Sequence, residues 1–346
     1  MARIFYGVQG DSNGHISRAL TVAELLQGHE ILFAGGGAVV RAREHGYAHE
    51  PLPLLATLSR NNKVDLLATA RVCGSAICGR SKWIRRLSEI ITAFDPALII
   101  TDYEYFTPLA AKQNGRMSVS LDHQHVITRT VYEPPPGQRI SRLLTEMAIE
   151  FVIGNASRFL MSSFHHPPVR DSRRDELFGT LTRSDVLSLR PEQGEHAVVY
   201  VRGGDLNKIR NLFQGRKREY RIYGFGKVQE QKNLRFRDLS REGFLKDLAS
   251  CAYVVSNGGH GLLSESLHLC KPTLCFPTLL AYEQYWNGIH IQRNGYGACH
   301  MRLDISPEAV GTFESRLERF RKNIAVHDFC GREALRVRLE NLLQRS

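Results

Sequence analysis

Short apolar runs alternate with longer segments of helical spacing along most of the chain. The predicted strands of the first half are residues 3–8, 29–34, 97–101 and 117–121. The helical patterns between them are residues 16–26, 38–45 and 107–114. Strands that alternate with helices in this way are typical of a parallel sheet covered by helices, so the pattern predicts an α/β, doubly wound architecture.

The same alternation begins again in the second half. Its predicted strands are residues 197–201, 219–223, 253–256 and 272–276. A proline pair, Pro167-Pro168, interrupts both helix and sheet between the halves. We therefore predict an N-terminal domain at 1–166, a second domain at 167–330 and a C-terminal helix at 331–346. The sequence leaves the packing of this helix open, and a return to the N-terminal domain is one alternative.

Composition agrees with two globular domains. The chain has 346 residues, of which 42% are hydrophobic and 23% charged, and this excludes wholesale disorder. There is no apolar run of about 18 residues, and the first residues form a predicted strand rather than a signal peptide, so we expect a cytoplasmic protein. Seven cysteines without a C-x-x-C pair favour reduced core thiols over disulfides or a metal site.

A positive charge excess points to an anionic partner. Lys and Arg number 46 against 35 Asp and Glu, a net charge of +11. A phosphorylated substrate, an acidic membrane surface and a nucleic acid all fit this excess, but none of the usual nucleic-acid motifs is present. Residues 60–86 mix seven basic side chains and one acid with leucines and Trp83. This stretch is either a solvated helical face or a contact for a membrane or an anionic substrate.

The loop after the first predicted strand is the first candidate site. It reads Gly10-Asp11-Ser12-Asn13-Gly14-His15 and leads into a helix. Its spacing fits neither G-x-G-x-x-G nor a P-loop. The end of a parallel strand and the start of a helix together form a common ligand position, so His15 is expected to lie near a bound anion.

Two further loops follow strands of the second half. One reads Ser256-Asn257-Gly258-Gly259-His260-Gly261 and continues to Glu265, and such bare backbone at a helix start suits a diphosphate. The other contains Glu283-Gln284, a carboxylate beside an amide, which together offer acceptors and donors to sugar hydroxyls. A structural turn is the alternative for each loop.

Together and in this order, the three loops resemble those of the GT-B glycosyltransferases. The likeness is to the branch that holds the peptidoglycan lipid-intermediate N-acetylglucosaminyltransferase and the UDP-glycosyltransferases. It extends over nearly the whole chain as a pattern and is specific over residues 253–297. The resemblance implies two Rossmann-like domains that face each other across a cleft, a nucleotide-sugar donor, with a UDP-sugar expected, and no cofactor or metal.

The resemblance also implies roles on the donor side. Glu265 would bind the ribose hydroxyls, and Glu283 and Gln284 would hold the donor sugar. Arg202 and Gly203, in the loop after the first strand of the second domain, would lie near the diphosphate. The residues that would face the diphosphate directly are Gly258, Gly259, His260 and Gly261.

In the first domain, Gly14 and His15 match the Gly-His loop of the family, whose histidine is the general base in many members, and Gly14 would also bind the donor. Asp102 matches a partner acid for that histidine. The resemblance thus implies inverting transfer to an acceptor hydroxyl. One departure is Gly261-Leu262, which stands where some relatives have a small hydroxyl residue.

Three questions stay open at the level of sequence. A nucleotide-sugar hydrolase or a 2-epimerase would use the same loops, because His15 could activate water instead of an acceptor. The acceptor could be lipid-linked, a glycan or a small molecule, and peripheral contact with the inner face of a membrane is an alternative to a purely cytoplasmic location. His123 and His125 could line the site or, with further ligands, bind a metal.

Overall fold

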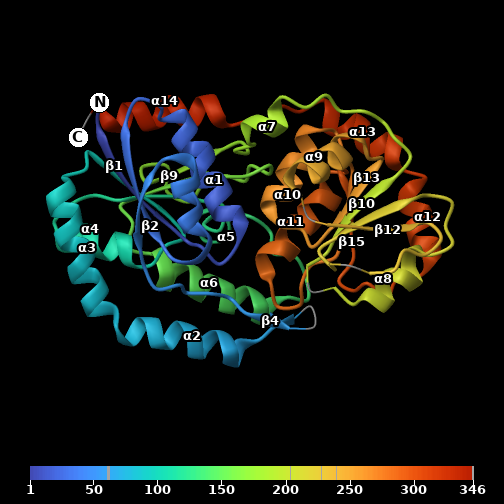
Figure 1. Ribbon diagram of the computed structural model, residues 1–346, viewed down its shortest axis with the longest axis horizontal. Helices are drawn as coiled ribbons and strands as arrows, with labels where there is room; N and C mark the ends of the chain where they lie inside the picture. The colour runs from blue at the N-terminus through green and yellow to red at the C-terminus, as the bar shows by residue number, and fades with distance from the viewer. Residues whose placement is uncertain (61–62, 203, 227, 239, 345–346) are drawn as a thin grey trace. The chain divides into compact units, whose positions relative to one another are not determined.

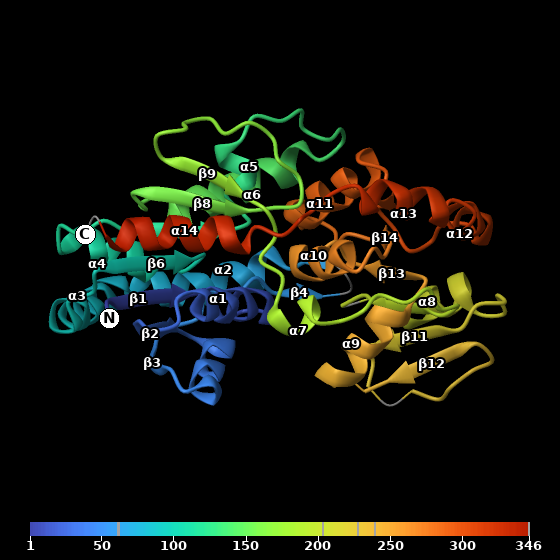
Figure 2. The ribbon, with the colours of Figure 1, turned by 90° about the horizontal axis from the view of Figure 1, so that it is seen from above.

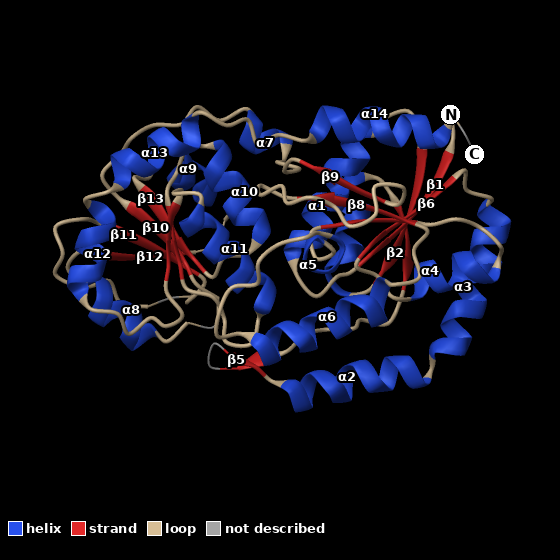
Figure 3. Cartoon of the chain, turned by 180° about the vertical axis from the view of Figure 1, so that it is seen from behind, coloured by secondary structure: helices blue, strands red, loops and turns tan. Residues whose placement is uncertain are grey.

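The computed structural model describes residues 1–60, 63–202, 204–226, 228–238 and 240–344. The chain forms two compact units (Figure 1). The first contains residues 1–58, 65–183 and 330–346, and the second contains residues 59–64 and 184–329. Each is a parallel sheet with helices on both of its faces (Figure 3).

The first unit is built on a seven-stranded sheet of order β3-β2-β1-β6-β7-β8-β9. The strands are β1 (Arg3–Val8), β2 (Glu30–Gly35), β3 (Ala48–Pro51), β6 (Leu98–Asp102), β7 (Val119–Asp122), β8 (Arg158–Ser162) and β9 (Asp175–Phe178). The helices are α1 (Asn13–Leu25), the 3-10 helix η1 (Gly37–His45), α2 (Leu66–Cys78), α3 (Arg80–Phe94), α4 (Phe106–Gln113), α5 (Val126–Arg129), α6 (Arg139–Ile153) and α14 (Arg332–Leu343).

The second unit is built on a six-stranded sheet of order β12-β11-β10-β13-β14-β15. Its strands are β10 (Ala197–Tyr200), β11 (Tyr220–Tyr223), β12 (Leu234–Arg237), β13 (Tyr253–Ser256), β14 (Thr273–Cys275) and β15 (Gly297–Cys299), with a small ladder of β4 (Ser59–Arg60) and β5 (Lys63–Val64). Its helices are α7 (Ser184–Leu187), α8 (Leu206–Phe213), α9 (Arg241–Ser250), α10 (His260–His268), α11 (Tyr282–Arg293), α12 (Pro307–Glu314) and α13 (Leu317–Ala325).

Hydrophobic patterning explains the central strands. β1 has no polar position between Ile4 and Val8, and all of these residues are buried because helices cover both faces of a parallel sheet. Several helices begin with a side-chain cap. Asp65 caps α2, Asp205 caps α8 and Ser306 caps α12, each by accepting a backbone N–H of the first turn.

The division between the units differs from the predicted boundary at 166/167. β9 pairs in parallel with β8, so residues up to 183 belong to the first sheet. The proline pair lies in the connection between these two strands and does not separate domains. β9 runs parallel to β8. It is a short edge strand that begins with two acidic residues, so its sequence lacks the apolar run by which other strands were predicted.

The C-terminal helix packs in the first unit. Leu335 and Leu339 of α14 are buried in the same hydrophobic cluster as Ile16 and Val22 of α1. Figures 1 and 2 show α14 beside α1, although more than 300 residues separate them in the chain. Arg332 contributes an ion pair to Glu24, 3.3 Å away. This is the return that the sequence left as one alternative.

Candidate active site

Both sheets reverse their strand order at one point, and the predicted site loops follow the strands there. In the first sheet the reversal lies between β1 and β6, and in the second it lies between β10 and β13. Ligands of open α/β sheets bind beyond the carboxyl ends of the strands at such a point. His15 and Asp102 flank the first reversal, and Arg202 and Gly258 flank the second.

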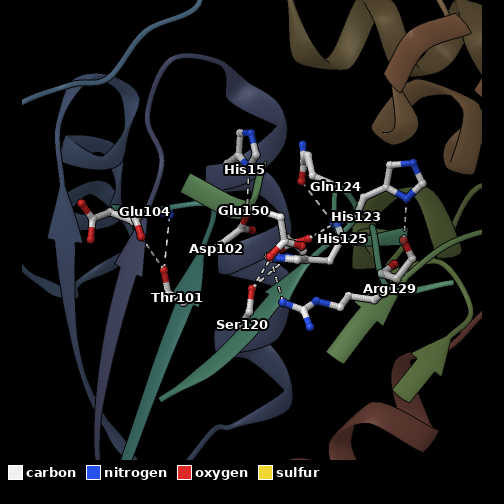
Figure 4. Close-up of polar contacts among 12 residues, drawn as sticks. His15, Thr101, Asp102, Glu104, Ser120, His123, Gln124, His125, Arg129 and Glu150 are labelled. Atoms are coloured by element: carbon white, nitrogen blue, oxygen red, sulfur yellow. Dashed lines mark hydrogen bonds and ion pairs between the residues drawn. The ribbon is translucent and has the colours of Figure 1, made fainter. Parts of the chain in front are cut away.

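His15 and Asp102 form a direct pair in the first unit (Figure 4). Nδ1 of His15 lies 2.7 Å from Oδ1 of Asp102. Asp102 is the last residue of β6, is fully buried, and is paired in register with Val8 of β1. His15 lies in the first turn of α1 with an exposed fraction of 8%. The pair predicted from the sequence is therefore formed, with one ring edge of the histidine held by a buried carboxylate.

The loop between β1 and α1 is held close to the neighbouring loop after β2. A Cβ on Gly10 would stand 1.8 Å from the carbonyl oxygen of Gly36, so only glycine fits there. Gln9 donates its backbone N–H to the carbonyl of Asp102 at 2.9 Å. Gly14 is exposed, and a Cβ there would meet only Ser12 Oγ at an ordinary 3.6 Å. The packing of the loop therefore requires glycine at position 10. At position 14 there is room for a side chain, and the space beside His15 is open.

Two residues that the sequence prediction did not name complete the surroundings of His15. Arg18 binds both oxygens of Asp102, with Nε 2.8 Å from Oδ2 and Nη2 2.6 Å from Oδ1. Tyr103 stacks on the imidazole, with ring centroids 5.8 Å apart, and has a φ of 53°, which is unusual for an aromatic residue. The spacing of three residues from His15 on one helix was a signal for Arg18; no sequence signal indicated Tyr103.

The electrostatics of His15 follow from these contacts. Burial lowers the pKa of the imidazole, while the charge and the hydrogen bond of Asp102 raise it, and the net direction is upward from the ordinary 6.5. Asp102 accepts the Nδ1–H in the assigned hydrogen-bond network, so in the neutral ring Nε2 is the nitrogen without a proton. That nitrogen is the atom at which the ring can accept a proton.

His123 and His125 are buried and do not line an open site. His125 pairs through Nδ1 with Asp122 Oδ2 at 2.7 Å, and Ser120 donates its hydroxyl to the same oxygen at 2.5 Å (Figure 4). His123 Nδ1 lies 2.8 Å from the carbonyl of Ser162. Despite the cost of burial, the bonds to His125 and Ser120 hold the pKa of Asp122 well below its usual range. Among the described residues, no group of three or more His, Cys, Asp or Glu could hold a metal ion.

In the second unit, one asparagine ties together the two loops at the reversal. Asn257 accepts the backbone N–H of Arg202 at 2.6 Å and donates to the carbonyl of Phe276 at 3.2 Å. Asn257 belongs to the loop predicted to bind the diphosphate, but its side chain had no predicted role. The Arg202 side chain is exposed, and Gly203 lies outside the described residues.

The glycines before α10 have different surroundings. Gly258 has a φ of +82°, and a Cβ would approach the backbone oxygen of Gln284 to 2.7 Å, so this position needs glycine. A Cβ on Gly259 or Gly261 would meet no heavy atom within 4 Å. The N-cap residue of α10 is Gly259, which has no side chain to cap the first turn. Bare backbone therefore lies at an accessible helix start, as expected of an anion site.

The remaining predicted donor residues lie on the helices α10 and α11. Glu265 and Glu283 are half-buried, and Glu283 lies in the first turn of α11. Gln284 accepts the backbone N–H of Thr278 through Oε1 at 2.9 Å, so it also shapes the loop before the helix. His260, the first residue of α10, is 8% exposed, with Nε2 3.4 Å from Ser264 Oγ. His260 is thus as little exposed as His15.

Comparison with known proteins agrees with this architecture. Two parallel sheets, each with its ligand loops at the reversal of strand order, define the GT-B class of glycosyltransferases. The chain is similar over 99% of its length to the spinosyn forosaminyltransferase SpnP, which it covers to 99%, at 15% identity and a TM-score of 0.70. It is similar over its full length to MurG of Acinetobacter baumannii, also fully covered, at 12% identity and a TM-score of 0.66.

Sequence comparison gives the family. An uncharacterized glycosyltransferase of Methanosarcina acetivorans is 23% identical over 336 residues, with 89% of this chain and 86% of the relative covered. The family model for glycosyl transferase family 1 matches residues 2–318. The chain belongs to glycosyl transferase family 1, and it is a glycosyltransferase.

Proposed function

We propose that the protein transfers a sugar from a nucleoside diphosphate sugar, with UDP as the expected carrier, to an acceptor hydroxyl with inversion at the anomeric carbon. The observation that carries the proposal is the hydrogen-bonded pair of His15 and Asp102 at the reversal of the first sheet. A base at this place needs an unprotonated nitrogen, and the bond to Asp102 leaves Nε2 in that form.

The proposed step is a single displacement. The acceptor oxygen forms a bond to the anomeric carbon, and the bond from that carbon to the diphosphate oxygen breaks. The hydroxyl proton passes to Nε2 of His15, and the electron pair of the broken bond leaves with the nucleoside diphosphate. Asp102 stabilises the imidazolium that results, as a buried carboxylate does beside other catalytic histidines.

We propose that the diphosphate binds at the start of α10. Support comes from the glycine N-cap of this helix and from the open space around Gly259 and Gly261. Backbone N–H groups and the helix dipole would stabilise the charge that develops on the leaving group, without an obligatory metal ion. Glu265, one turn further into the helix, would accept hydrogen bonds from the ribose diol, and Glu283 with Gln284 would bind the sugar.

The acceptor side of the proposal rests on an exposed apolar face in the first unit. Helix α6 presents a stripe of large apolar side chains with exposed fractions of 40–75%. These residues are Ile140, Leu143, Leu144, Met147 and Phe151. Such a stripe on a soluble helix usually packs against something else. Of the described helices, none is long and apolar enough to cross a bilayer.

The same unit supplies positive charge for this face. Leu66 and Leu67 on α2 are also exposed, and basic side chains accompany both helices, among them Arg71 and Arg139. Of the stretch 60–86, Trp83 instead packs against the core with Arg86 over its ring. We propose that α2 and α6 contact an anionic lipid surface from which a lipid-linked acceptor would be drawn.

A thermal-shift screen with UDP, GDP, TDP and CDP tests the donor proposal, with adenosine nucleotides for comparison. A ligand that binds only the folded state raises the free energy of unfolding by about 2.7 kcal/mol when its concentration is a hundred times Kd. One diphosphate should raise the melting temperature. Product analysis with the matching sugar nucleotide then separates the reactions. A new glycoside formed only with acceptor present supports transfer, whereas release of free sugar or of an epimer without acceptor would show hydrolysis or epimerisation.

A further inference from the structure

Arg18 holds the carboxylate of Asp102 as tightly as His15 does. Its guanidinium binds both carboxylate oxygens, and its Nη2 lies 3.1 Å from Nδ1 of His15. The side chains of Arg18 and His15 are each 10% exposed, and that of Asp102 is fully buried. Residues three apart on a helix share a face, so α1 presents both groups to the same carboxylate. The site is a buried triad rather than a pair.

The charges of this triad differ from those of an isolated histidine and carboxylate. A guanidinium stays protonated at all accessible pH values, so Arg18 and Asp102 together are neutral. A neutral His15 therefore leaves the triad uncharged, whereas an imidazolium gives it one net positive charge in a place with little water. Without Arg18, the imidazolium would instead neutralise the carboxylate. Arg18 accordingly favours the neutral ring.

We infer that Arg18 is a positioning residue that fixes the orientation of Asp102 and favours the neutral form of His15, the form that accepts a proton. The inference rests on the proposed role of His15 as the base and extends it to a residue that neither the motif nor the family match assigns. Arg18 acts through Asp102 and His15; it is not proposed to touch the substrate.

The other groups that face the triad are few. Tyr103, after β6, stacks on the His15 ring, and the charge of Asp11 in the loop before α1 raises the pKa of His15, against the lowering effect of Arg18. Asp122 and Tyr6 act on Arg18, whose pKa is raised above its ordinary value because the attraction of Asp102 exceeds the cost of burial. None of these groups replaces the two-point bond of Arg18 to Asp102.

Titration of His15 by NMR tests the inference without any substrate. Protein with ¹⁵N-labelled histidine is followed between pH 5 and 9, and the His15 signals are assigned by their absence from H15Q. In R18M the midpoint should move to higher pH, because the competing cation is gone. In R41M it should stay, since Arg41 reaches α1 through Asn13 Oδ1 at 3.3 Å and not the triad. An unchanged or lower midpoint in R18M would overturn the inference.

A second comparison covers the case in which R18M does not fold. D102N and the double variant R18M/D102N both lack the carboxylate charge, so neither buries an unpaired anion. The arginine remains only in D102N, so D102N should titrate at a lower pH than the double variant. Equal midpoints in these two proteins would also contradict the inference.

Kinetics then connect the triad to the reaction. R18M should lose about tenfold in kcat at pH 6.5 and much less at pH 8.5, where its histidine is again neutral, while R41M keeps the wild-type profile. A loss in R18M that is the same at every pH would assign Arg18 a structural role only. If the His15 titration shifts in R18M but the protein has no transferase activity, the inference about Arg18 stands and the proposed function is rejected. If transfer depends on His15 but the titration does not shift in R18M, the proposed function stands and the inference about Arg18 is rejected.

Discussion

Nδ1 of His15 lies 2.7 Å from Oδ1 of Asp102, although 87 positions separate the two residues in the chain. The distance is short because β1 leads into α1 and pairs with β6, so the start of the helix and the end of the neighbouring strand meet at one edge. The carboxylate is fully buried, and it therefore has a strong effect on the imidazole. The first two predictions follow from this contact.

Removal of the proposed base should abolish most of the transfer. We expect H15Q to lower kcat by about 10²–10⁴, the usual contribution of a positioned general base. The change in melting temperature with nucleoside diphosphate should stay close to the wild-type value, because most of the residues proposed to bind the donor lie in the second unit. Steady-state rates and thermal shifts measure the two effects. H45Q is the matched control, since His45 lies at the end of η1. A variant H15Q with nearly full kcat would reject the proposed base.

The rate should depend on pH in a defined direction. His15 must be neutral to accept a proton, and its pKa is raised above 6.5 because the attraction of Asp102 outweighs burial. Activity should therefore fall on acidification at a higher pH than for an unperturbed histidine. In D102N the maximum should fall, and the acidic limb should move to lower pH, because the raising charge is lost. A profile of kcat/KM from pH 5 to 9 records both changes, and an acidic limb that stays in place in D102N would contradict the assignment.

Donor binding should depend on Glu265. E265Q removes the charge of Glu265 and leaves one acceptor oxygen, so one of the two proposed ribose hydrogen bonds is lost. The affinity for the selected diphosphate should fall at least about tenfold, since a bond to a charged acceptor contributes roughly 1.5–3 kcal/mol. Isothermal titration calorimetry measures the affinity. E242Q removes an exposed carboxylate from the first turn of α9 and should bind normally. If E265Q and E242Q bound the diphosphate with equal affinity, Glu265 would not be the residue that binds the ribose.

The buried pair of Asp122 and His125 should make the protein sensitive to acid. The pKa of Asp122 is depressed, so its contribution to stability is complete above its unfolded value of 3.8 and is lost as pH falls through the lower folded value. D122N should be less stable than wild type by about 3–5 kcal/mol at pH 7, and the difference should narrow below pH 4. Melting temperatures at several pH values test this. A difference that does not depend on pH would mean that packing alone is lost.

Membrane contact should need both the apolar stripe and salt-sensitive attraction. We expect wild type to sediment with vesicles of phosphatidylcholine and phosphatidylglycerol, and less with phosphatidylcholine alone or at high ionic strength. M147E should abolish sedimentation, because it places a charge in the stripe of α6. V337E is the control, since Val337 is 46% exposed on α14. No binding of the wild-type protein to anionic vesicles would reject the membrane proposal while leaving the donor site untouched.

The sequence determined the strands on both sides of each strand-order reversal and the loops that follow them. β1 and β13 have the predicted bounds, because strands covered on both faces are continuous apolar runs ended by glycine or polar residues. His15 and Gly258 could be placed for the same reason, since each follows such a strand. The edge strands β3, β9, β12 and β15 were missed, because short, half-exposed edges have no clear apolar pattern. The interior strand β8 was missed as well, although most of its residues are buried.

Only the tertiary structure decided what surrounds these loops. The order of strands brings Asp102 to the histidine, and the turn of α1 adds Arg18 to the same carboxylate. Pairing of β8 with β9 moves the division of the units past the prolines, and burial against α1 brings α14 back to the first unit. A local sequence pattern indicates whether one segment is a helix or a strand, from the spacing of its apolar residues, and which of its faces is buried. Partners distant in the chain are chosen by packing between segments, which no local pattern contains.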